Sequence, residues 1–210
     1  MSTPYLMTHS LLYSWQYALR ENPYADATTE DTSMSDFLRT LRREPTPTTE
    51  AMQNGIDFED LVTRVVSGRA DARDQSSPWF DAAGRVAFQI RGAFLQYKAK
   101  KMISVNGTDF LLYGRLDALK AGTVFDIKFS GKYERGKFYD STQHPVYLEL
   151  LPEAYRFVYL ISDGRNVWTE EYHREDTRSV IPIIQDFMAW LSTQNLMETY
   201  KKHWTSLPNN

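Results

Sequence analysis

The sequence predicts an α/β (α+β) fold, in which a central mixed β-sheet is flanked by helices. Residues 1–92 contain several segments with apolar residues at helical spacing, whereas residues 94–129 are rich in β-branched and aromatic residues. A further helix and a further hairpin pattern follow. Helices before and after a strand meander are typical of an α+β domain, or of an α/β domain with a mixed sheet.

The 210 residues are expected to form one domain, residues 1–210, because 42% of them are hydrophobic. This domain has an N-terminal helical part, about 1–92, and a C-terminal helical tail, about 177–210. The sequence has no cysteine, which excludes disulfides and cysteine-ligated metal centres. Neither a signal-peptide pattern nor a long apolar window occurs, so we expect no membrane partner and a cytoplasmic location.

The N-terminal part predicts helices at about 11–21, 36–44, 48–67 and 77–92. Thr48 or Thr49 can cap the third of them, and Gly68 can end it. Three antiparallel strands are expected at 94–105, 108–119 and 123–129, because Asn106-Gly107 between two apolar runs is a strong hairpin signal. A helix at 143–151, with Pro145 in its first turn, and a hairpin over 155–173 complete the prediction.

The second turn sets a register with chemical consequences. If Lys120 pairs with Thr123, Asp117 lies opposite Asp126, where like charges roughly 4.5–5.5 Å apart at Cβ destabilise the sheet. Lys128 or a divalent cation could compensate; the alternative is a surface salt-bridge cluster. Strand alternation then sorts the side chains into an apolar face of Leu112, Leu116, Ala118, Phe125, Ile127 and Phe129, and a polar face of Tyr113, Arg115, Asp117, Asp126 and Lys128.

These residues resemble the PD-(D/E)XK nuclease superfamily. "GRLDAL" followed by "VFDIK" places an acid on one strand and acid–apolar–lysine on the next, with Leu116 where the name has proline. "QHPVY" is similar to the Gln-x-x-x-Tyr motif of the branch with recombination-repair helicase–nuclease domains, lambda-type phage exonucleases and CRISPR-associated nucleases. "NGIDFEDLV" resembles that branch's first helix, with Glu59 as the best match and Asp60 as the second choice. The resemblance covers about residues 5–173; the four-cysteine iron–sulfur site of CRISPR-associated relatives is absent.

The resemblance implies a restriction-endonuclease-like core and an Mg²⁺- or Mn²⁺-dependent deoxyribonuclease, such as a recombination or repair exonuclease. Asp117, Asp126, the Ile127 carbonyl and Glu59 would converge on the metal. Lys128, expected to be mostly exposed to the cleft, would orient or activate water and stabilise the transition state. Gln143 would position Lys128 or the substrate, and Tyr147 would pack beneath the site or touch the DNA backbone.

DNA is the expected partner, because residues 84–137 carry 11 basic against 4 acidic residues, although the whole chain has a formal charge of −3. A second copy of the chain or a recombination protein are further partners to consider. Two alternatives stay open: a nuclease-fold protein that binds without cutting, and an unrelated interaction protein. The basic residues are expected to line one groove leading to the acids, with candidate phosphate contacts at Lys98, Lys100, Lys101, Arg115, Lys132, Arg135 and Lys137.

Overall fold

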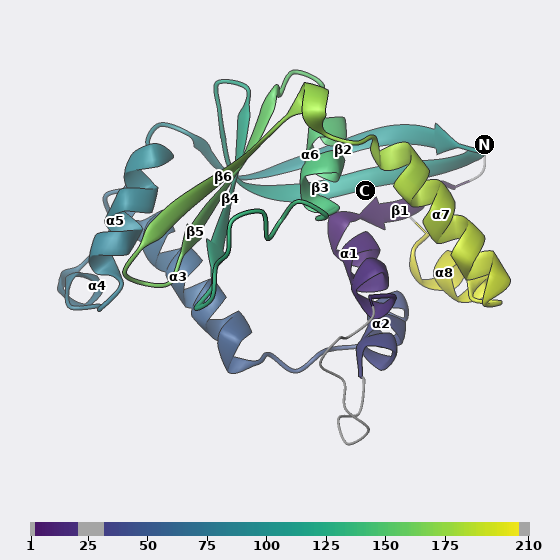
Figure 1. The fold of residues 1–210 in the computed structure, drawn as a ribbon, viewed down its shortest axis with the longest axis horizontal. Coiled ribbons are helices and arrows are strands. Elements are labelled where there is room, and N and C mark those ends of the chain that lie inside the picture. Colours follow the sequence, from purple (N-terminus) through teal and green to yellow (C-terminus); the bar gives the residue numbers. More distant parts are fainter. Residues whose placement is uncertain (1–2, 21–31, 206–210) are drawn as a thin grey trace.

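The structure, a computed structural model, describes residues 3–20 and 32–205. It confirms the predicted α/β fold, because a mixed six-stranded sheet lies among flanking helices (Figure 1). The strand order is β1-β3-β4-β5-β6, and β2 pairs with β3. The β1/β3 and β4/β5 pairs are parallel, and the other pairs are antiparallel. The strands are β1 (Tyr5–Thr8), β2 (Phe94–Val105), β3 (Thr108–Lys120), β4 (Thr123–Phe129), β5 (Arg156–Ser162) and β6 (Val167–His173).

The helices follow the predicted order, and their ends follow local signals. Thr49 caps α3 by accepting from the Met52 amide, and Gly68, with a φ of 66°, follows the end of that helix. Pro145 lies in the first turn of α6, as expected. The α-helices are α1 (His9–Ala18), α2 (Ser33–Leu41), α3 (Glu50–Val66), α4 (Ala72–Gln75), α5 (Phe80–Gln89), α6 (Gln143–Leu150), α7 (Val180–Thr193) and α8 (Met197–His203).

Both predicted strand turns are present, with the predicted register. Asn106 and Gly107 adopt φ of 50° and 76°, which suits the right-handed twist of the β2–β3 hairpin. Ala121 and Gly122 adopt φ of 48° and 71°, and Lys120 pairs with Thr123. Alanine in this left-handed region costs more than glycine or asparagine, because its Cβ crowds the backbone.

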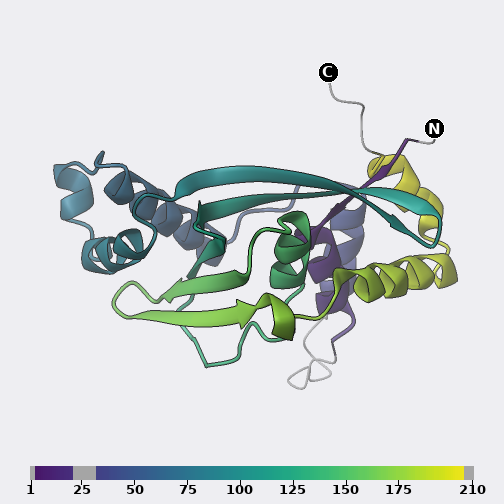
Figure 2. The same cartoon turned by 90° about the horizontal axis from the view of Figure 1, so that it is seen from above.

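The interior consists of two hydrophobic clusters on opposite faces of the β4–β5 part of the sheet, because Phe157, Tyr159 and Ile161 belong to one cluster and Val158 and Leu160 to the other. Helices α1, α2, α7 and α8 gather at one end of the molecule and α3, α4 and α5 at the other (Figure 1). The long β2–β3 hairpin extends from one group of helices to the other (Figure 2). The larger cluster contains Trp15, Phe157 and Phe187, and the smaller one contains Phe58 and Phe125.

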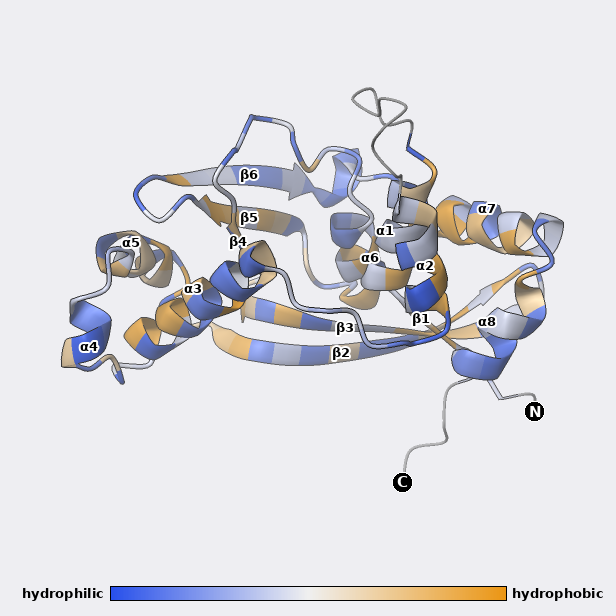
Figure 3. Cartoon of the chain, turned by 90° about the horizontal axis from the view of Figure 1, so that it is seen from below, coloured by the Kyte–Doolittle hydropathy of each residue, from blue (hydrophilic) through white to orange (hydrophobic). Residues whose placement is uncertain are grey.

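The predicted single apolar face is wrong, because β4 is buried on both sides. Leu112 and Leu116 belong to the larger cluster, whereas Ala118, Phe125 and Ile127 belong to the smaller one, against which Phe129 packs. The neighbouring strand β5 is apolar along most of its length, while the edge strand β6 is more polar (Figure 3). The alternate residues of β4 therefore point into the protein rather than into solvent.

The N-terminal strand β1 is held by residues near the other end of the chain. The Leu6 amide donates to the Trp204 carbonyl at 2.6 Å, and the Tyr200 hydroxyl donates to the Leu6 carbonyl at 2.9 Å. The Trp204 indole donates to the Leu41 carbonyl at 2.8 Å, which ties α2 to the same corner. Since α1 begins directly after β1, these contacts also fix the start of α1.

No helix in the described ranges is both long enough and apolar enough to cross a bilayer.

Candidate active site

The candidate site lies at a gap in the sheet. One edge of β3 is shared by two strands: β1 pairs with residues 110–113 and β4 with residues 118–120, so residues 114–117 have no strand partner there. Helix α6 packs against this gap. A Cβ on Gly114 would lie 2.2 Å from the ring of Tyr147, and the Tyr147 hydroxyl donates to the Arg115 carbonyl at 3.0 Å. Tyr147 is 7% exposed and packs beneath the site, one of its two predicted roles.

Asp117 lies where β3 and β4 separate. The strand ladder ends at Ala118 and Phe125, one pair before Asp117 and Asp126. The Asp117 carboxylate instead accepts the Ile127 amide, with Oδ2 at 2.7 Å from the nitrogen. Burial, followed by the negative charges of Asp126 and Glu59, raises the pKa of Asp117 well above its ordinary value. The acids therefore form an electrostatically coupled group.

Asp126 is buried between β4 and α6, with 6% of its surface exposed, so the expectation of an outward-facing acid is wrong. Its Oδ1 accepts a hydrogen bond from the Gln143 side-chain amide. The sequence predicted that Gln143 positions Lys128 or the substrate, whereas its hydrogen bond goes to Asp126. The Oδ2 of Asp126 forms an ion pair with Lys128, at 2.7 Å from Nζ. A carboxylate oxygen accepts more than one partner, so this oxygen can also bind a cation.

Lys128 is less exposed than predicted, because β4 is covered on both faces. Only 32% of its side chain is exposed. Burial alone would lower its pKa, but the adjacent charge of Asp126, with smaller contributions from Asp117 and Glu59, raises the pKa of Lys128 above its ordinary value. Lys128 is therefore a cation at neutral pH, placed beside a buried acid.

Glu59 projects from α3, and its Oε1 accepts the Gln96 side-chain amide at 2.8 Å. Asp60, the second choice, is exposed and lies in a different cavity with Arg64 and Asp74. Across the described ranges, no three or more His, Cys, Asp or Glu side chains converge as a preformed metal cage. Neighbouring acids whose charges raise the pKa of Asp117 fit a divalent cation chemically, and the metal-binding set stays a prediction.

The basic residues do not line one groove as expected. Ala99 and Val105 face the larger core and set the alternation of β2, so Lys98 and Lys100 point away from Lys101. Lys101 bonds Glu149 of α6 at 2.6 Å. Arg115, opposite Lys98 in the ladder, is exposed. The positive charge is thus divided between the two faces of β2 and the loop before α6.

That loop, residues 130–142, carries Lys132, Arg135 and Lys137 and is anchored by one buried carboxylate. Glu170 of β6 accepts from the Tyr133 and Tyr172 hydroxyls and from two backbone amides of the loop. Within the loop, Lys137 Nζ contacts Ser130 Oγ at 2.8 Å and the Lys132 carbonyl at 2.9 Å. The basic loop is therefore held in a defined shape beside α6.

His9 is the residue at this site that sequence reasoning missed. It begins α1, its Nδ1 lies 2.9 Å from Thr142 Oγ1, and its ring borders cavities on both sides of α1. Burial, then the positive charge of Lys128, lowers the pKa of His9 to about 3, so the ring is neutral. The histidines of the sequence show no metal-ligand spacing. The feature that could have pointed to His9 is its spacing from Tyr13 and Tyr17, which follow it at intervals of four residues on the polar side of α1.

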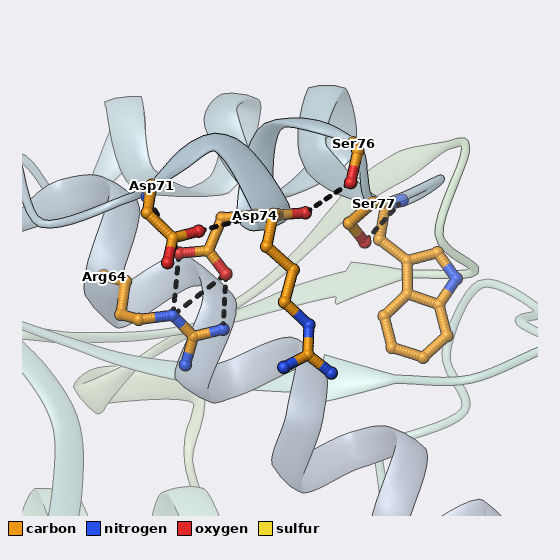
Figure 4. A network of polar contacts seen from close by, with 7 residues as sticks. Arg64, Asp71, Asp74, Ser76 and Ser77 are labelled. Atoms are coloured by element: carbon orange, nitrogen blue, oxygen red, sulfur yellow. Dashed lines mark hydrogen bonds and ion pairs between the residues drawn. The ribbon is translucent and has the colours of Figure 1, made fainter.

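A second polar cluster lies at the far end of the sheet and gives a reference for the first (Figure 4). Arg64 of α3 donates to both carboxylate oxygens of Asp74 at 2.9–3.1 Å. Asp71 and Asp74 form a reciprocal capping box at the start of α4. The hydrogen bond and charge of Arg64 lower the pKa of Asp74.

The sequence matches no protein-family model and no curated protein. The fold is similar to the crystal structure of SSO0001, with a TM-score of 0.54 and 15% sequence identity over 93% of this chain and 79% of that chain. Identity this low supports a shared fold alone.

Proposed function

We propose that the protein is a metal-dependent deoxyribonuclease of the PD-(D/E)XK type, which hydrolyses phosphodiester bonds. The observation that carries this proposal is the arrangement at Asp126: a buried acid paired with a cationic Lys128, and Asp117 across the point where the strands separate, with its pKa raised by burial and by the charges of Asp126 and Glu59. Like-charged acids gathered in a buried site are typical of functional sites.

Each polar residue of the site has a distinct task in this proposal. Asp117, Asp126, Glu59 and the Ile127 carbonyl would hold Mg²⁺ or Mn²⁺, which would supply Lewis-acid polarisation of the scissile phosphate. Gln143 fixes the carboxylate plane of Asp126 by donating to Oδ1. Lys128 presents a permanent positive charge where negative charge develops on the phosphate in the transition state.

One observation favours the alternative function, nucleic-acid binding without cleavage. The described residues contain no preformed group of three metal-ligating side chains, and Glu59 bonds Gln96. Cleavage requires the Glu59 side chain to turn from Gln96 towards Asp117, or the metal to be held by the two aspartates and the Ile127 carbonyl.

The deciding experiment is incubation of the protein with linear and circular DNA, single- and double-stranded, in Mg²⁺, Mn²⁺ or EDTA. We expect cleavage with a divalent cation, none in EDTA, and none by Asp126→Ala. Equal cleavage by wild type and Asp126→Ala would identify a contaminating nuclease. Binding without cleavage of any substrate in either metal would reject the enzyme in favour of the alternative.

A further inference from the structure

One cavity beside the candidate active site has a wall that the proposed chemistry does not use. It lies between α1 and the loop before α6 and has a volume of about 470 Å³. Lys128 and Gln143 border it from the side of the acids, Tyr13 and Tyr17 border it from α1, and Arg20 borders it from just beyond the end of α1. The volume lies in the range of pockets that hold small ligands, roughly 300–1,000 Å³.

The α1 wall is an aromatic ladder of His9, Tyr13 and Tyr17. The His9 and Tyr13 rings are 5.8 Å apart, and the Tyr13 and Tyr17 rings are stacked at 6.1 Å with an interplanar angle of 27°. Tyr13 is 41% exposed and Tyr17 is 53% exposed. The opposite side of α1 carries the buried residues Leu11, Leu12 and Trp15, so the core does not account for the ladder.

Positive groups border the same cavity. Arg20 lies just beyond the C-terminal end of α1, Lys137 lies on the loop before α6, and Lys128 borders the cavity from β4. Exposed aromatic rings beside a row of cations are the combination that binds single-stranded nucleic acid, because every unpaired base offers a π-face and every linkage a phosphate. A base in a duplex is stacked between its neighbours and cannot offer that face.

We propose that this ladder binds an unpaired strand of nucleic acid, with bases stacked on Tyr13 and Tyr17 and phosphates near Arg20 and Lys137. The inner end of the cavity then delivers a linkage of that strand to Lys128. The delivery step rests on the proposed function, whereas the binding step does not. Stacking on rings is tolerant of sequence, so the preference is for unpaired bases rather than for a particular base.

The test is a binding titration in EDTA, where a metal-dependent nuclease does not cut. The probes are a labelled single-stranded DNA, an abasic strand of the same length, and a blunt duplex. Tyr13→Ala and Tyr17→Ala are each expected to weaken binding of the single strand about tenfold, because losing a base–ring stack typically has an effect of this size. Both variants should bind the abasic strand as wild type does.

Two controls keep the result specific to the rings. Tyr13→Phe retains the ring and should keep wild-type affinity, and Tyr155→Ala removes a tyrosine of similar exposure, 51%, outside this cavity. Equal losses on normal and abasic strands, or unchanged single-strand affinity in both alanine variants, would overturn the ladder. If binding depends on the rings but the protein cuts no DNA, the proposed binding site is supported and the proposed nuclease activity is rejected. If the protein cuts DNA but neither alanine variant changes binding, the nuclease activity is supported and the proposed binding site is rejected.

Discussion

The two polar clusters of this protein differ in how well their charges are balanced. Around Asp74, one arginine and one backbone amide satisfy the carboxylate, and its pKa falls. Around Asp117 and Asp126, like charges lie together beside the ion pair with Lys128, and the pKa of Asp117 rises. The first arrangement stabilises the join between α3 and α4, whereas the second retains unused binding capacity.

The largest effect is expected when the positive charge of Lys128 is removed from the candidate site. Lys128→Ala should lower the rate of DNA cleavage about a hundredfold or more, because a charge partner of the transition state is lost. Lys201→Ala, which removes an exposed lysine paired with Glu198, is the matched control and should cut at the wild-type rate. Single-turnover rates on the form of DNA that the wild type cuts fastest measure both. A wild-type rate for Lys128→Ala would remove this residue from the chemistry.

Replacing an aspartate by asparagine should stabilise the fold in one cluster and destabilise it in the other. Asp117→Asn removes a repelling charge while its amide oxygen can still accept the Ile127 N–H, so the free energy of unfolding in EDTA should rise. Asp74→Asn breaks the bidentate contact with Arg64 and should lower the melting temperature. Denaturant titrations of both variants give the answer. Destabilisation by both would mean that the coupled acids are a structural ion-pair network.

The pH dependence of stability should also separate the two regions. Burial, then the charge of Arg178, lowers the pKa of His144 to about 3. Below about pH 6.5, His144 is therefore protonated in the unfolded chain but stays neutral in the folded chain. Stability from this group is complete above pH 6.5 and is lost as the pH falls towards 3, by about 2 kcal/mol at pH 5. The contribution of Asp74 is lost only below its ordinary value of 3.8.

Unfolding titrations at pH 7 and pH 5 test this assignment. His144→Gln should reduce the loss of stability between the two values, whereas His173→Gln, at an exposed position, is the control and should not. His144 stacks on Tyr172 at 4.0 Å, so the variant is compared with itself across pH rather than with wild type at one pH. An unchanged loss in His144→Gln would place the acid sensitivity elsewhere.

The smallest expected effect lies outside both clusters, at the β3–β4 turn. Ala121 has a φ of 48°, which asparagine tolerates better than alanine. Ala121→Asn should therefore raise the free energy of unfolding by about 0.5–1 kcal/mol without changing cleavage. Thermal unfolding with a parallel activity assay measures both quantities. A change in cleavage would show that the turn influences the separation of β3 and β4 at the acids.

Local signals account for the parts of this structure that the sequence predicted. Asn106-Gly107 and the pairing of Lys120 with Thr123 fix the three strands, because turn geometry sets hairpin register. Thr49 and Gly68 mark the ends of α3 in the same way. The shared face of Asp117, Asp126 and Lys128 then follows from strand alternation, whereas Gln143 and Glu59 were candidates because "QHPVY" and "NGIDFEDLV" resemble motifs of the family.

What the sequence did not predict depends on contacts between distant segments. Asp126 is buried because α6 covers β4, and strand alternation alone cannot show which face a helix will cover. His9 contacts Thr142, 133 residues away, so its place beside the site leaves no local pattern. The division of the β2 lysines between two faces follows from which alternate residues meet the core, which is again a tertiary property.

The attachment of β1 to Trp204 and Tyr200 joins segments that lie 194 residues or more apart in the sequence. Because α1 begins directly after β1, a substitution that loosens α8 from β1 also removes one support of the wall formed by α1. We therefore expect α8 to influence the cavity beside α1 although it contributes no residue to the cavity lining.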